Sequence, residues 1–301
     1  MKSTVLIADL QDRYHSAAQA QEFIRLAARC GATAASLRFC TQQQAPSPIG
    51  APHIAALGEE AERAGVLLLP TPWDLTALSQ LCQLSVPLLH LPGHLLTDPQ
   101  ALELAAATGR PIIAMAGLCT MPELKAAASY LKQLQAGPLT VLQSGSQGEV
   151  PADRANLRAM VLLKGSLQCS VGYADHTRSI EAAIAAVAIG AEVVQKPVHL
   201  DSPLPHTLSM EEFAGLAAAI RRLGGALGTG RRDLIEQDLI ERSRTYTGLA
   251  AARPIAAGQT VTADDLCVAA GGGLSPLLAA AFISAPAPRD YAPGDPIDLI
   301  S

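Results

Sequence analysis

The chain has 301 residues, of which 49% are hydrophobic, so it can bury a sizeable core as one large domain or as one large and one small domain. A formal net charge of −5 and an aromatic content of 3% argue against nucleic acid as the main partner. The apolar segment at the N-terminus is too short for a signal peptide, and the run 182–191 is too short to span a bilayer. We therefore expect a soluble, cytoplasmic protein without a membrane partner.

Eight short apolar segments alternate with alanine-rich helical segments over the first 223 residues. Nearly continuous apolar character is typical of parallel strands that are buried on both faces. Eight such repeats predict an α/β protein with a (β/α)8 TIM barrel rather than an open sheet. The predicted strands are 4–9, 33–39, 66–70, 87–91, 111–116, 139–143, 168–171 and 191–196.

The pattern changes after residue 223. A glycine-rich, basic segment follows at 224–232, then a helical stretch at 233–242, and then a region with many Pro and Gly residues and few helix signals. We predict a barrel domain at 1–223, a linker at 224–245 and a small β-rich domain at 246–301.

Polar residues follow several predicted strands at the point where each strand ends. His90, His176 and His199 all lie at such ends, where a TIM barrel builds its active site, and Asp9 ends the first strand. Three imidazoles with a carboxylate would suit Zn²⁺ or another transition metal. Alternatively, His176 caps the following helix together with Asp175, and Asp9 bonds backbone amides.

Four segments match motifs of a known family. They read Gly-Tyr-Ala-Asp-His-Thr at 172–177, Leu-Pro-His-Thr-Leu-Ser at 204–209, Ala-Arg-Pro-Ile-Ala-Ala-Gly at 252–258 and Gly-Gly-Gly-Leu-Ser-Pro at 271–276. On these motifs the chain resembles the N-acetylneuraminate (sialic acid) synthase family, which joins a TIM barrel to a C-terminal antifreeze-like (SAF) domain. The resemblance implies condensation of phosphoenolpyruvate with an N-acyl hexosamine to a 2-keto sugar acid. It also implies a divalent metal, Mn, Mg or Zn, that polarises the sugar aldehyde.

The family pattern suggests a role for each candidate residue. His176 matches one metal ligand of the family, Pro197 occupies the position of the other, and His199 lies two residues further on. Ser36 and His90 stand where the family has lysines that hold phosphoenolpyruvate. The candidates are Asp9 and His176 for catalysis, His176 and His199 for metal, and Arg38, His90, Asp175, Lys196 and His206 for substrate.

The absence of the two family lysines, at Ser36 and His90, affects the expected function. Removing the partner of a buried charge typically costs several kcal/mol, so we do not expect ordinary sialic acid synthesis. The resemblance favours a synthase-like enzyme with an altered sugar or keto-acid substrate. The alternative is a non-catalytic homologue that binds a sugar-like ligand or a partner enzyme. We also expect a homodimer, because in the family the SAF domain caps the barrel of the partner.

Overall fold

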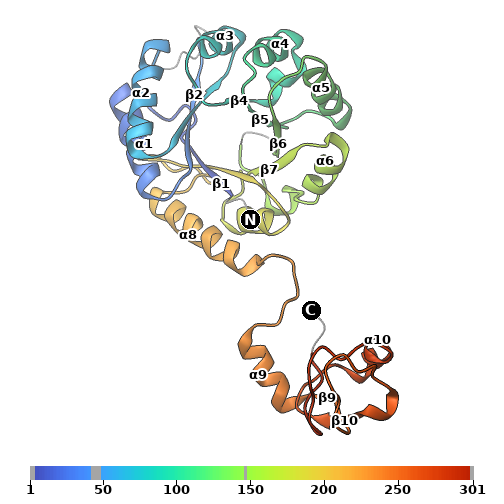
Figure 1. Cartoon of the computed structure of the whole chain (residues 1–301). Coiled ribbons are helices and arrows are strands. Elements are labelled where there is room, and N and C mark those ends of the chain that lie inside the picture. Colours follow the sequence, from blue (N-terminus) through green and yellow to red (C-terminus); the bar gives the residue numbers. More distant parts are fainter. Residues whose placement is uncertain (1–3, 42–48, 146–147, 299–301) are drawn as a thin grey trace. The chain divides into compact units, whose positions relative to one another are not determined.

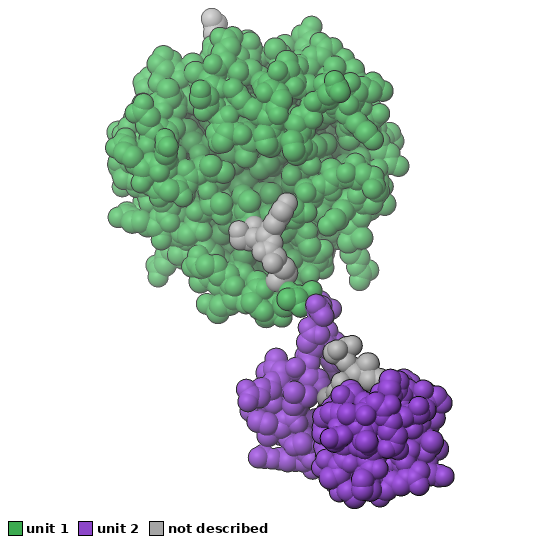
Figure 2. Space-filling view, in the orientation of Figure 1, with its two compact units in different colours: residues 1–229 green, residues 230–301 purple. Residues whose placement is uncertain are grey.

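In the computed structural model, residues 4–41, 49–145 and 148–298 are described. The chain forms two compact units, residues 1–229 and 230–301, shown in green and purple in Figure 2. Within the described residues, no helix is both long enough and apolar enough to cross a membrane.

The first unit is an eight-stranded parallel α/β barrel, as the sequence predicts, with helices packed around the strands (Figure 1). Each predicted strand has an observed counterpart at nearly the same position. The described strands are β1 (Val5–Asp9), β2 (Ala34–Phe39), β3 (Leu67–Pro72), β4 (Leu89–Leu91), β5 (Ile112–Met115), β6 (Leu139–Gln143), β7 (Ser170–Ala174) and β8 (Val193–Pro197). The helices around them are α1 (Ala17–Arg29), α2 (Ala51–Ala64), α3 (Leu75–Gln83), α4 (Pro99–Ala107), α5 (Met121–Gln133), α6 (Ala159–Leu167), α7 (Glu181–Ala188) and α8 (Met210–Leu227).

The order of the strands in the sheet is β3-β2-β1-β8-β7-β6-β5-β4. Strands β3 and β4 are therefore the two ends of the hydrogen-bonded sheet. They lie against each other, but in the described part of the chain no ladder of backbone hydrogen bonds joins them. The barrel is closed by side-chain packing at this one place.

The strands are apolar because both of their faces are buried. One set of side chains fills the barrel interior, among them Ile7, Leu69 and Leu142, and the other set packs under the helices. Gly172 permits close packing of β7 on β8, because a Cβ there would lie 2.3 Å from the carbonyl oxygen of Val193. A side chain at this position would push the two strands apart.

Helix α8 continues to Leu227, four residues past its predicted end at 223. Gly224 and Gly225 lie within the helix, although they read as linker in the sequence. Glycine lowers helix stability by about 1 kcal/mol per residue but does not forbid the helix, so the preceding turns can extend through it.

The second unit contains helix α9 (Glu236–Thr245), a two-stranded antiparallel pair and short helical turns. Strands β9 (Thr247–Ala251) and β10 (Leu266–Ala270) pair with Leu266 opposite Ala251. A small core includes Leu249, Val261 and Tyr291. The remaining elements are the 3-10 turns η1 (Gly93–Thr97), η2 (Ala152–Arg154), η3 (Ala263–Asp265) and η4 (Pro276–Leu278), and α10 (Ala279–Phe282).

Candidate functional site

A small pocket opens at the carboxyl ends of the barrel strands, with a volume of about 30 Å³. It brings together three residues singled out in the sequence, Asp9, Arg38 and His176. The pocket is also lined by residues that the sequence reasoning missed: Gln11, Thr71, Trp73, Met115 and Gln195. This location is where TIM barrels place their active sites.

Asp9 ends β1 and is almost completely buried. Its Oδ1 accepts a hydrogen bond from the backbone N–H of Gln11 at 3.1 Å, and its Oδ2 accepts one from Gln195 Nε2 at 2.7 Å. Burial raises the pKa of the Asp9 carboxyl, and hydrogen bonds from Gln195, Gln11 and Ser36 oppose this rise. Asp9 therefore takes up a proton more readily than an exposed carboxyl would.

Five buried side chains form one polar network inside the barrel. Asp9 lies opposite Ser36 in the register of β1 and β2, the Ser36 hydroxyl lies 3.0 Å from Thr71 Oγ1, and Thr71 Oγ1 lies 2.7 Å from His90 Nδ1. Gln195 also faces His90, although Gln195 Oε1 and His90 Nε2 have no partner of normal hydrogen-bond geometry among the described residues. We call this set, Asp9, Ser36, Thr71, His90 and Gln195, the polar network.

Burial sets the ionisation of His90. The imidazole is only 1% exposed, and burial lowers its pKa from 6.5 to about 4, while Gln195 partly opposes the effect. His90 is accordingly neutral at neutral pH and does not replace the positive charge of a lysine.

Arg38 supplies positive charge to the pocket. Its guanidinium lies 4.0 Å from the centre of the Trp73 ring and donates to Asp12 Oδ2 at 2.7 Å. The His94 ring meets Trp73 edge-on, with ring centres 4.9 Å apart, and His94 Nε2 lies 3.0 Å from the Trp73 carbonyl oxygen. Stacking on an aromatic face orients the guanidinium at the rim of the pocket.

The predicted metal ligands His176 and His199 have different surroundings. The His176 ring stacks on His206, with ring centres 5.6 Å apart and an interplanar angle of 30°. His199 Nδ1 lies 2.9 Å from Thr207 Oγ1. Burial, then Arg13 and Lys196, lowers the pKa of His206.

The side chains at the barrel mouth show whether a metal ion could be bound there. Among the residues that the structure describes, no group of three or more His, Cys, Asp or Glu side chains is arranged to hold a metal ion. A protein zinc site normally has three or four such ligands. The described donor set does not fit a metal ion.

Lys196 and Asp175 are completely buried and form an ion pair of 2.9 Å. Lys196 Nζ also donates to the carbonyl oxygens of Thr177 at 2.6 Å and Ser179 at 3.0 Å. The Asp175 carboxylate accepts from the backbone N–H of Thr177 at 2.9 Å and from its hydroxyl at 2.8 Å. The polar groups of these two predicted substrate-binding residues thus bind each other and the loop after β7, which carries His176.

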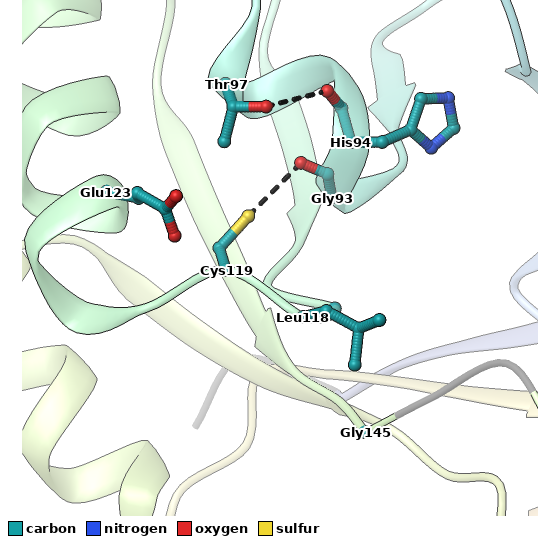
Figure 3. Close-up of a pocket in the computed structure, with 8 residues that line it drawn as sticks. Gly93, His94, Thr97, Leu118, Cys119, Glu123 and Gly145 are labelled. Carbon is teal, nitrogen blue, oxygen red and sulfur yellow. Dashed lines mark hydrogen bonds between the residues drawn. The ribbon is translucent and has the colours of Figure 1, made fainter.

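A second pocket of about 370 Å³ lies beside the mouth, over the ends of β4, β5 and β6 (Figure 3). Cys119 Sγ donates to the Gly93 carbonyl at 3.2 Å, and Thr97 Oγ1 donates to the His94 carbonyl at 3.1 Å. Burial and the neighbouring Glu123 raise the pKa of the Cys119 thiol, so it is a poor nucleophile. The pocket has room for a ligand, but its described lining lacks Lys and Arg.

Comparisons with known proteins agree with the barrel and its motifs. Residues 23–232 match the model of the NeuB family. The chain is 32% identical to an uncharacterized protein of Methanocaldococcus jannaschii over 217 residues, covering 70% of this chain and 64% of that protein. It is 28% identical to the N,N'-diacetyllegionaminic acid synthase of Campylobacter jejuni over 239 residues, covering 77% of this chain and 72% of the synthase.

A solved structure extends this similarity to the fold. The N-acetylneuraminic acid synthetase of Leptospira borgpetersenii superposes with a TM-score of 0.73 at 24% identity, covering 79% of this chain and 90% of that one. At this identity the superposition supports the barrel fold.

Proposed function

The chain belongs to the NeuB family, and we propose that it is a synthase-like protein of carbohydrate biosynthesis whose barrel mouth takes an altered sugar or keto-acid substrate. The observation that carries the proposal is the polar network. Ser36 and His90 stand where the family resemblance implies lysines that hold phosphoenolpyruvate, and here both are hydrogen-bonded to Thr71 inside the barrel.

The remaining charges define the chemistry of the proposed site. Arg38 is placed to attract a carboxylate, and Asp9 is placed to exchange a proton with a bound oxygen. His176 lines the same pocket, and His206 stacks on it. A small keto acid or sugar aldehyde has the oxygen atoms that these groups can bind, whereas the doubly charged phosphate of phosphoenolpyruvate lacks its usual lysines.

The alternative is a non-catalytic homologue that binds a sugar-like ligand or a partner enzyme. The ion pair between Lys196 and Asp175 favours it, because two polar residues close to the mouth stabilise a loop and present no polar group to a ligand. Both proposals share a small-molecule site at the mouth and differ in turnover.

We further propose a homodimer, a cytoplasmic location and an SAF identity for the C-terminal residues 246–301. Exposed apolar side chains on and before α9 support association, since Ile235 is 65% exposed and Leu239 is 44% exposed. Contiguous exposed apolar residues of this kind commonly mark protein contacts.

A paired assay distinguishes the two functional proposals. Purified protein is incubated with phosphoenolpyruvate or pyruvate and a panel of N-acyl hexosamines, with and without Mn²⁺ or Mg²⁺, and the 2-keto acid product is measured. Binding of each compound is followed in parallel by saturation-transfer NMR. Turnover with any pair supports the altered enzyme, and binding without turnover supports the non-catalytic homologue.

A matched pair of variants locates the binding. Arg38→Gln should weaken pyruvate binding about tenfold or more, because a charge-assisted hydrogen bond to a carboxylate contributes roughly 1.5–3 kcal/mol. Arg29→Gln, at the exposed end of α1, should leave binding unchanged. If no compound binds to the wild-type protein and no product forms, the proposed site is wrong.

A further inference from the structure

We propose that two adjoining cavities of the barrel unit bind one ligand, an N-acyl sugar whose acyl chain is longer than acetyl, an inference that rests on the proposed small-molecule site. The first cavity is the 370 Å³ pocket of Figure 3, which we call the side pocket. The second has a volume of about 470 Å³ and lies between α4 and α5, and we call it the helix groove. The sugar ring occupies the side pocket, and the acyl chain occupies the helix groove.

The two cavities adjoin each other because Thr97 and Glu123 line both of them. Figure 3 shows these two side chains on the side of the side pocket that faces away from the His94 ring. The side pocket also adjoins the small pocket at the barrel mouth, since His94 lines one and Trp73 lines the other, with their ring centres 4.9 Å apart. A ligand at the mouth can therefore extend outwards into the helix groove.

The helix groove follows one face of α5. The residues of α5 that line it lie three, four and seven positions after the first, so they share one side of the helix. They are Glu123, Ala126, Ala127 and Tyr130. Seven residues rise about 10 Å along a helix, which gives the length of the groove. Its middle is lined by two alanines, whose short side chains leave space between α4 and α5.

The helix groove suits a hydrocarbon chain. Its floor is formed by Leu96, Leu102 and Ala127, which line the groove and are at most 6% exposed. A chain that lies on this floor leaves water for an apolar surface, which is favourable. At the far end, the Tyr130 hydroxyl donates to Glu103 Oε1 at 2.6 Å and joins α5 to α4. This contact limits the length of chain that fits.

The junction between the two cavities accepts hydrogen bonds. Thr97 Oγ1 donates its proton to the His94 carbonyl oxygen at 3.1 Å, so towards a ligand it acts as an acceptor. Glu123 Oε2 accepts from the Thr120 backbone N–H at 2.6 Å and from the Thr120 hydroxyl at 2.7 Å, which holds the carboxylate in place. A carboxylate is ionised at neutral pH and has no proton to donate. An uncharged donor such as an amide N–H therefore suits the junction.

The charges identify the class of ligand. The described linings of the two cavities contain one carboxylate, Glu123, and no Lys or Arg. A phosphate ester or a free fatty acid would therefore meet a like charge without a compensating cation. An N-acyl sugar is uncharged, and its amide lies between the ring and the acyl chain. With the ring in the side pocket and the chain in the helix groove, the amide N–H can donate to Glu123.

A series of N-acyl mannosamines tests the proposal on the full chain. The probes are the N-acetyl, N-butanoyl, N-hexanoyl and N-octanoyl compounds, and the Kd of each is measured by calorimetric titration. Each methylene group that enters the helix groove should tighten binding about two- to fourfold, because burial of a CH₂ group is favourable. An equal Kd across the series, or no binding of any member, would overturn the inference.

A matched pair of variants locates the acyl chain. Ala126 is exposed and lines the helix groove, so Ala126→Phe fills the groove and leaves the core unchanged. The N-octanoyl compound should then bind no better than the N-acetyl compound, whose Kd should not change. Ala185→Phe makes the same change at an exposed position of α7 that lines neither cavity, and it should keep the dependence on chain length. A dependence that survives Ala126→Phe would contradict the proposed position of the chain.

Failure of this proposal is distinguishable from failure of the proposed function. Pyruvate binding reports on the small pocket that Arg38 lines, and it should be equal in wild type and Ala126→Phe, since Ala126 does not line that pocket. If chain length has the expected effect but pyruvate does not bind and no product forms, the proposed function fails and the ligand assignment stands. If product forms from the N-acetyl compound and chain length has no effect, the ligand assignment fails and the proposed function stands.

Discussion

The buried ion pair behind the β7 loop gives a prediction about stability. Lys196→Met keeps a side chain of similar length but removes the ammonium that binds Asp175 at 2.9 Å. It also leaves the carbonyl oxygens of Thr177 and Ser179 without that donor. Both members of the pair are 0% exposed, so water cannot replace the lost partner.

The expected loss is large for one substitution. Removing one partner of a buried pair costs about 3–5 kcal/mol, because the other charge stays buried and uncompensated. For a unit of this size, that loss corresponds to a decrease in Tm of roughly 6–20 °C. The chain has one tryptophan, Trp73, which lies in the first unit, so its fluorescence during urea unfolding reports on the barrel alone.

Two further variants make the measurement specific. Lys164→Met, an exposed lysine on α6, should change the free energy of unfolding by less than about 0.5 kcal/mol. Adding Asp175→Asn to Lys196→Met should restore part of the stability, because the unpaired charge is then absent. A loss below about 1 kcal/mol for Lys196→Met would show that the pair does not hold the loop.

Four other outcomes are expected. Because the described donor set does not fit a metal ion, calorimetric titration with Zn²⁺ or Mn²⁺ should show no tight binding and no difference between wild type and His176→Ala; tight binding that His176→Ala abolishes would contradict this. The pKa of Asp265 is lowered to about 2, first by its hydrogen bonds with Thr262, so the stability it contributes is complete above about pH 4 and is lost as pH falls towards 2; acid unfolding of Asp265→Asn followed by circular dichroism should lack this dependence. Light scattering at micromolar concentration should give a dimer, and a persistent monomer would contradict the proposed association. With phosphoenolpyruvate, N-acetylmannosamine and Mn²⁺, no N-acetylneuraminate should form at a rate typical of the family, and product at such a rate would contradict the proposed change of substrate.

The sequence predicted the barrel well because its strands are short, apolar and regularly spaced. Strand boundaries were less certain. The strand predicted at 168–171 is observed as β7 (Ser170–Ala174), since Gln168 adopts a left-handed conformation with φ of 52° and ends α6. A polar residue between a helix and a strand gave little indication of which element it would join.

The site was only partly predictable. Asp9 and His176 were identified because polar residues at strand ends stand out, and Arg38 was identified through the family resemblance, but Thr71 and Gln195 were missed. Successive residues of a strand point to opposite faces, so Gln195 and Lys196 must face different ways. When both faces of a strand are buried, the sequence does not reveal which face lines the barrel. The face of β8 that lines the barrel is set by the parallel register of β1 on β8.

The place where β3 meets β4 has a consequence for how this barrel can change. Seven neighbouring strand pairs are joined by backbone hydrogen bonds, which nearly any sequence can form. Across the eighth boundary, the described contact between Thr71 and His90 is made by side chains. The spacing of β3 and β4 is therefore set by residue identity, so single substitutions there can widen or narrow the mouth of the barrel while every backbone ladder is kept. These two positions, Thr71 and His90, therefore influence the size of the ligand that the barrel can admit.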